Sequence, residues 1–126
     1  MSDAPTAPLR YSLLRHTGAP DDPSGCHYDL LLEDGETCRS WRLPAIPALN
    51  GTTQEATLLP DHRRVWLQPR SAAVSGDRGW AERVMAGRYQ GTLPADPTAA
   101  VQVDLLDGEL RGQLRIKAGC CSLTPP

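Results

Sequence analysis

The chain has 126 residues, of which 40% are hydrophobic, and a formal net charge of −2. This length favours one domain with a single core, and the ordinary 22% of charged residues argues against a disordered chain. The slightly acidic balance argues against broad binding along duplex DNA, because that mode needs many basic residues against the phosphates.

Both ends of the chain are expected to be flexible. Residues 1–9 and 118–126 are rich in Pro, Ala, Ser and Thr, so the folded domain is expected to span residues 10–117. The start, MSDAPTAPLR, lacks the pattern of a secretory signal, and apolar runs such as LLL at 30–32 are far shorter than the ~20 residues of a membrane helix. We therefore expect a cytoplasmic monomer. Its four cysteines form no zinc motif and are expected to be reduced thiols, with a Cys26–Cys38 bridge as the alternative.

Between the ends, the residue pattern is that of short strands. In chain order the candidate strands cover residues 10–16, 27–33, 36–43, 53–58, 63–68, 88–93, 101–106 and 109–117. Asp34-Gly35 and Asp107-Gly108 separate neighbouring candidates and are strong signals for hairpin turns. Helix-friendly composition is limited to residues 80–86, which are equally compatible with a strand. The pattern predicts a mostly β fold, a sandwich or a compact barrel of about seven or eight antiparallel strands with minor helical additions.

The candidate chemistry lies with the histidines, because the sequence has no phosphate-binding glycine loop and no nucleophile elbow. His27 and Asp29 alternate on one candidate strand, so their side chains point to the same face. His16, near the end of the preceding strand, can supply a third ligand. Two imidazole nitrogens and a carboxylate suit Zn²⁺ or Mn²⁺ and leave positions open for water or phosphate. The alternative is that the histidines are ordinary surface residues and that Asp61-His62 is only a turn.

Several short motifs follow one another in a specific order. They are a histidine closing the first strand (His16), HYDLLLE at 27–33, the Asp-Gly turn, SWRLP at 40–44 and Asp61-His62. In this order they resemble the 3′-phosphoesterase domain at the N-terminus of bacterial ATP-dependent DNA ligase D, over about residues 10–117. The resemblance implies a compact β-barrel and Mn²⁺-dependent removal of a 3′-terminal ribonucleotide or 3′-phosphate. It also implies DNA or RNA 3′ ends as substrates and ligase or polymerase repair proteins as partners.

The resemblance assigns roles by motif position. His16, His27 and Asp29 would hold the metal, and His62 would contact the phosphate and stabilise charge in the transition state. Glu33 matches the acidic residue that closes the strand motif, with no role assigned to it.

Three positions depart from the family pattern. Leu31, Ala45 and Trp66 stand where the resembled family has arginine, lysine and tyrosine. Losing one preorganised donor typically lowers a rate ~10²–10³-fold. The nearby arginines are therefore the candidates to bind substrate phosphate: Arg15, Arg42, Arg63 and Arg64. Of these, Arg42 or Arg64 is preferred. We expect a metal-dependent phosphoesterase-like protein that processes 3′ ends in strand-break repair. The alternative is a catalytically impaired relative that binds nucleic-acid ends or a repair partner.

Overall fold

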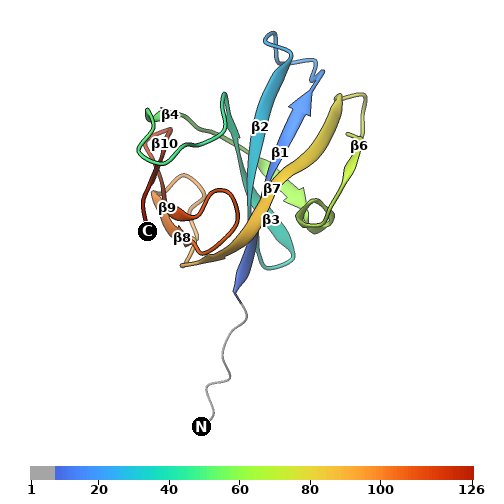
Figure 1. Cartoon of the computed structure of the whole chain (residues 1–126). Helices are drawn as coiled ribbons and strands as arrows, with labels where there is room; N and C mark the ends of the chain where they lie inside the picture. Colours follow the sequence, from blue (N-terminus) through green and yellow to red (C-terminus); the bar gives the residue numbers. More distant parts are fainter. Residues whose placement is uncertain (1–7) are drawn as a thin grey trace.

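The computed structural model describes residues 8–126, and this part of the chain is almost entirely β-structure (Figure 1). The elements are β1 (Leu9–Thr17), β2 (Cys26–Asp34), β3 (Thr37–Leu43), β4 (Gln54–Glu55), β5 (Thr57–Arg63), the 3-10 helix η1 (Arg64–Leu67), β6 (Ser71–Ala73), β7 (Trp80–Gln90), β8 (Val101–Leu105), β9 (Gly112–Lys117) and β10 (Cys120–Thr124). All paired strands run antiparallel. The expectation of a mostly β, antiparallel fold is confirmed. Within residues 8–126, no helix has the length and apolar character needed to cross a membrane.

The strands form one sheet in the order β4-β10-β9-β8-β7-β1-β2-β3-β5, with β6 paired to β7 outside this path. The end strands β4 and β5 do not pair with each other, so the sheet is not closed into the expected barrel. Instead, β4 and β5 are consecutive along the chain and are separated only by Ala56, whose N–H donates to the carbonyl of Gly119 at 2.8 Å. One extended segment, residues 54–63, therefore pairs with β10 at its start and with β3 along the rest.

The apolar side chains of the central strands are divided between the two faces of the sheet. The large cluster includes Leu30 and Leu32 of β2 together with side chains of β1, β3 and β7 to β10. The small cluster packs on the opposite face and consists of Leu14, Leu31, Cys38, Trp66, Leu67 and Ala81. Because both faces of β2 are buried, its sequence is a continuous LLL run rather than a strict alternation.

One segment inside the domain differs from the strand expected of it, and a second is decided between two alternatives. Residues 63–68 contain η1, which places Trp66 and Leu67 in the small cluster. Residues 80–86, for which helix and strand were equally compatible, form the first part of the eleven-residue strand β7. In both segments tertiary packing, rather than local composition, decides the backbone conformation.

Most of the C-terminal segment belongs to the sheet, so the expectation of flexible residues over 118–126 does not hold for residues 120–124. Residues Cys120–Thr124 form β10, which pairs with β9 and β4. Cys121 and Leu123 are buried in the large cluster, and this burial holds the segment in place. The matching expectation for residues 1–9 falls mainly on residues 1–7, which lie outside the described part of the chain, whereas Leu9 already begins β1.

The two Asp-Gly pairs behave differently. In the first hairpin Asp34 pairs with Thr37, so the turn is Gly35-Glu36, one residue later than predicted. Gly35 has a φ of 64°, as expected for glycine at the first position of a type II′ turn. The second pair lies in the longer connection of residues 106–111 and makes no two-residue hairpin. All four cysteines are free thiols, which excludes the alternative Cys26–Cys38 bridge.

Candidate metal centre

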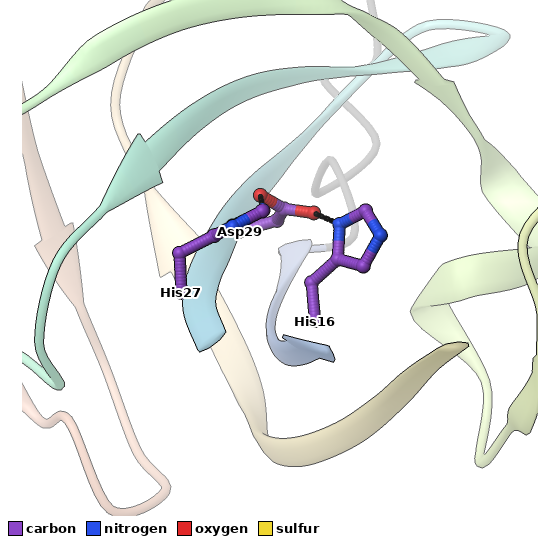
Figure 2. Close-up of side chains that lie close together, drawn as sticks. All are labelled: His16, His27 and Asp29. Carbon is purple, nitrogen blue, oxygen red and sulfur yellow. Dashed lines mark hydrogen bonds and ion pairs between the residues drawn. The ribbon is translucent and has the colours of Figure 1, made fainter. Parts of the chain in front are cut away.

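Three of the residues singled out from the sequence meet at one end of β1 and β2 (Figure 2). His16 lies opposite His27 in the strand register, and their ring centroids are 4.6 Å apart. Asp29 follows two residues later on the same face of β2. The possible ligand atoms of the three buried residues all lie within 4.8 Å of one another. Strand alternation thus brings them together as expected, and the cluster could hold a metal ion.

The contacts of His27 leave one ring nitrogen without a hydrogen bond. Its Nδ1 lies 2.7 Å from Oδ2 of Asp22, and hydrogen bonds from Ser24 and His27 lower the pKa of Asp22 to about 2. An ionised carboxylate only accepts hydrogen bonds, so Nδ1 donates, and in a neutral ring Nε2 would then carry the lone pair. This buried Nε2 lies 3.2 Å from Oδ1 of Asp29, and neither atom has a hydrogen-bond partner. A histidine that donates its other N–H to a carboxylate is the usual arrangement at a metal site.

His16 is oriented in the same way by a different acceptor. Its Nε2 lies 2.6 Å from the carbonyl oxygen of Arg78, so this nitrogen is the donor. Its Nδ1 faces Oδ2 of Asp29 at 3.2 Å, the contact drawn in Figure 2. The hydrogen bond to Asp29 raises the pKa of His16 despite the opposing effect of burial. With a neutral ring, the lone pair of Nδ1 would face an oxygen lone pair, so this contact needs a proton or a metal cation between the two atoms.

Asp29 is the shared centre of these contacts, and His62 of β5 approaches it as well. Nε2 of His62 lies 3.7 Å from Oδ2 of Asp29, and the His62 side chain is 22% exposed. Burial raises the pKa of Asp29, but the contacts with the three histidines outweigh burial and hold this pKa well below its usual range. A buried, ionised carboxylate among imidazoles provides the negative charge that a divalent cation requires.

Arg42 lies beside this cluster. It stands opposite Asp29 in the register of β2 and β3, and its Nη2 pairs with Oδ2 of Asp21 at 3.2 Å. The Nε of Arg42 is buried and has no hydrogen-bond partner. Of the arginines singled out from the sequence, Arg42 is therefore the one that the register brings next to the candidate ligands.

Arg64 and Arg15 lie away from the cluster. Arg64 donates to Oε2 of Glu33 at 2.8 Å, and Glu33 also accepts from Arg10, so these residues form a separate ion-pair group further along β2. Arg15 alternates with His16 on β1 and is exposed, so its side chain points to the opposite face of the sheet. The structure thus does not bring Arg15 or Arg64 to the candidate metal centre.

The three positions that depart from the resembled family carry no polar side chain toward the cluster. Leu31 is fully buried and Trp66 is 6% exposed, both within the small cluster. Ala45 is exposed and uses its backbone to exchange hydrogen bonds with the side chain of Gln54.

Sequence reasoning missed two groups that orient the histidines. Asp22 was visible as part of an acidic pair in the loop before β2, but nothing in its spacing connected it with His27. The carbonyl of Arg78 belongs to the backbone and comes from a distant loop, so no side-chain pattern marks it.

Compared with models of known protein families and with curated proteins, the chain matches none of them. The chemical interpretation of the cluster therefore depends on its contacts, above all on the two imidazole nitrogens that face Asp29.

Proposed function

We propose that this protein is a metal-dependent phosphoesterase-like protein that processes 3′ ends of DNA or RNA in strand-break repair. The observation that carries the proposal is the orientation of His16 and His27, each with one nitrogen donating to a fixed acceptor and the other facing Asp29. This donor set suits a divalent transition metal, and Mn²⁺ is the proposed ion, with Zn²⁺ as the alternative. The order of motifs from His16 to His62 supports the phosphoester class.

A divalent cation bound here would polarise a phosphoryl oxygen and lower the pKa of bound water. In this proposal His62, partly exposed beside Asp29, donates a hydrogen bond to the substrate phosphate and stabilises charge as the ester bond breaks. Arg42 supplies a positive group next to the cluster, since guanidinium binds phosphate oxygens in a bidentate manner. Asp22 keeps the ring of His27 in the required tautomer.

The alternative function is a catalytically impaired relative that binds nucleic-acid ends or a repair partner. The burial of Leu31 and Trp66 favours this alternative, because both side chains contribute to packing rather than to phosphate binding. A site with leucine and tryptophan in place of the arginine and tyrosine of the resembled family retains its metal ligands but has fewer groups that stabilise a transition-state charge.

The deciding experiment uses a primer that ends in a 3′-ribonucleotide or a 3′-phosphate. The protein is incubated with it in Mn²⁺ and then in EDTA. Trimming to a 3′-hydroxyl that EDTA abolishes supports the phosphoesterase, whereas end-specific binding without trimming supports the binding module. A protein that neither trims the primer nor binds its 3′ end contradicts the phosphoesterase and the binding of nucleic-acid ends.

Asp29→Asn provides the matched test of the site, because it keeps the shape of the side chain and removes its charge. We expect loss of Mn²⁺ binding and of trimming in this variant. Asp104→Asn, at an exposed carboxylate on β8, is the control and should trim like the unmodified protein.

A further inference from the structure

A cavity of about 350 Å³ opens on the sheet beside the start of β1 and the end of β7, away from the candidate metal centre. Ala86 and Gly87 contribute to its lining without long side chains, and three arginines surround them: Arg10, Arg83 and Arg88. Arg10 and Arg88 are direct partners in the register of β1 and β7. We call this cavity the arginine pocket.

Arg83 has a positive charge that no carboxylate of residues 8–126 neutralises through a salt bridge. Its Nη1 donates to the carbonyl of Leu67 at 2.9 Å, which fixes the guanidinium at the pocket. A guanidinium has five N–H donors, so this single contact leaves donors for a ligand.

Arg10 and Arg88 each have one carboxylate partner. The Nε of Arg10 lies 3.2 Å from Glu33, and the Nε of Arg88 lies 2.7 Å from Asp107. Their side chains are 39% and 56% exposed, so solvent screens both pairs and an incoming anion can share the guanidinium groups. With Arg83 included, three guanidinium groups in the pocket are paired with only two carboxylates, in a protein whose net charge is −2.

The wall of the arginine pocket is held in place before any ligand arrives. The carboxylate of Asp107 accepts the backbone N–H of Arg88 at 2.7 Å, and the hydroxyl of Tyr11 donates to the carbonyl of Asp107 at 2.8 Å. A Cβ at Gly87 would lie only 2.6 Å from that same carbonyl oxygen. Glycine at position 87 thus allows the loop to pack closely against β7 and keeps the pocket open.

We propose that the arginine pocket binds backbone phosphates of the nucleic-acid strand whose 3′ end lies at the candidate metal centre, an inference that rests on the proposed function. Arg10 and His16 are on the same strand and, with Glu33 and Asp29, on the same face of the sheet. At ~3.3 Å per residue, their separation along β1 is about 20 Å. That length corresponds to about six nucleotides at the ~3.4 Å rise of a stacked strand. A compact group of guanidiniums at this distance suits one strand end rather than a long duplex.

The binding test uses a fluorescein-labelled single strand of ten nucleotides in EDTA, so that no metal contributes. Replacing both Arg83 and Arg88 by glutamine should weaken binding at least fivefold. It should also lower the slope of log affinity against log salt by about 0.7 for each phosphate that the variant no longer neutralises. Arg115→Gln is the control, since this exposed arginine of β9 lies outside the arginine pocket and donates a hydrogen bond to the side chain of Gln102. Equal weakening by Arg115→Gln would overturn the proposal, because it would indicate a general effect of charge.

A local measurement keeps the test valid if the double variant is unstable. In the unmodified protein, titration with the same strand should shift the amide resonances of Ala86 and Gly87. Shifts with inorganic phosphate but not with the strand would mean a pocket for a small free anion and would contradict the proposal, as would the absence of any shift.

The outcome is separable from that of the proposed function. His27→Ala should abolish metal-dependent trimming and leave strand binding in EDTA within twofold. If the unmodified protein trims 3′ ends but the arginine pocket does not bind the strand, only the present inference fails. If the pocket binds the strand but no trimming occurs with Mn²⁺, the proposed catalysis fails and the pocket remains.

Discussion

The two faces of β2 differ in how they accommodate burial. On one face, Leu30 and Leu32 pack into the large cluster among other apolar side chains. On the other, the fully buried Leu31 lies between Asp29 and Glu33, each of which is also buried. Histidines surround the first carboxylate, whose Oδ1 has no hydrogen-bond partner, and arginines pair with the second. The comparison shows that one strand can be buried on both sides and still carry charged groups where basic side chains converge on them.

We call the face of β2 that carries Asp29, Leu31 and Glu33 the polar face. The largest effect is expected when a charge is placed at Leu31, the apolar residue on this face. Leu31→Arg would bury a cation within the small cluster, where Asp29 and Glu33 are already paired. We expect the free energy of unfolding to fall by about 3–5 kcal/mol, measured by urea denaturation. Val84→Arg, at a position that is 36% exposed on β7, is the control and should change stability little. A stable Leu31→Arg variant would show that this face is more open than its packing indicates.

His62 sharpens the comparison, because it borders the polar face without being fully buried. In the proposed phosphoesterase, His62→Ala should lower turnover about 100-fold, equivalent to about 2.7 kcal/mol, and change the affinity for Mn²⁺ less than threefold. Single-turnover trimming and calorimetric titration measure the two quantities. Equal losses of both would make His62 a ligand rather than a group that acts on the phosphate.

Metal binding tests the histidine end of the polar face directly. At a free Mn²⁺ or Zn²⁺ concentration about 30 times the dissociation constant, the folded state should gain about 2 kcal/mol. The thermal midpoint should rise accordingly and return to its starting value in EDTA. His27→Ala should remove this shift, whereas His62→Ala should keep it. An equal rise in both variants would place the binding elsewhere in the protein.

The arginine end of the same face should give a smaller, pH-dependent effect. Burial raises the pKa of Glu33, but hydrogen bonds from Arg10 and Arg64 outweigh burial and lower this pKa below its ordinary value. The stabilisation is therefore fully present above the unfolded pKa near 4.3 and is lost as the pH falls through the lower folded-state pKa. Because both arginines are more than a third exposed, solvent screening limits the effect to about 1 kcal/mol.

Denaturation of the unmodified protein and of Glu33→Gln between pH 6 and pH 3 measures this contribution. The difference in stability between the two proteins should shrink as the pH falls. A difference that stays constant over this range would assign the effect of the substitution to packing instead.

Sequence reasoning located the candidate site because strand alternation is local. His27 and Asp29 share a face whatever the sheet does around them, and the hairpin at Gly35 was marked by its dipeptide. The path of β10 was not predictable in this way. Its short CCSLT sequence follows β9 through the two-residue turn Ala118-Gly119 but resembles a polar tail. Cys121 and Leu123 are buried because side chains of strands far away in the sequence pack around them.

The orienting acceptors of the histidines were beyond prediction for a related reason. The loop carbonyl that fixes His16 comes from a residue 62 positions away. The opposite placement of Arg15, in contrast, was predictable from the same alternation that groups His27 with Asp29, because Arg15 and His16 are neighbours on β1.

The shared segment of β4 and β5 has a consequence for self-association. An open sheet ordinarily offers two free margins on which another chain can add a strand, the first step toward aggregation. Here the margin at β4 is only two residues long and the further margin at the side strand β6 only three. The margin at β5 contains Pro60, which has no N–H to donate, followed by Asp61 and Arg63. An incoming strand therefore finds few consecutive donors and acceptors to pair with, and the sheet is protected from templated growth although it is not closed.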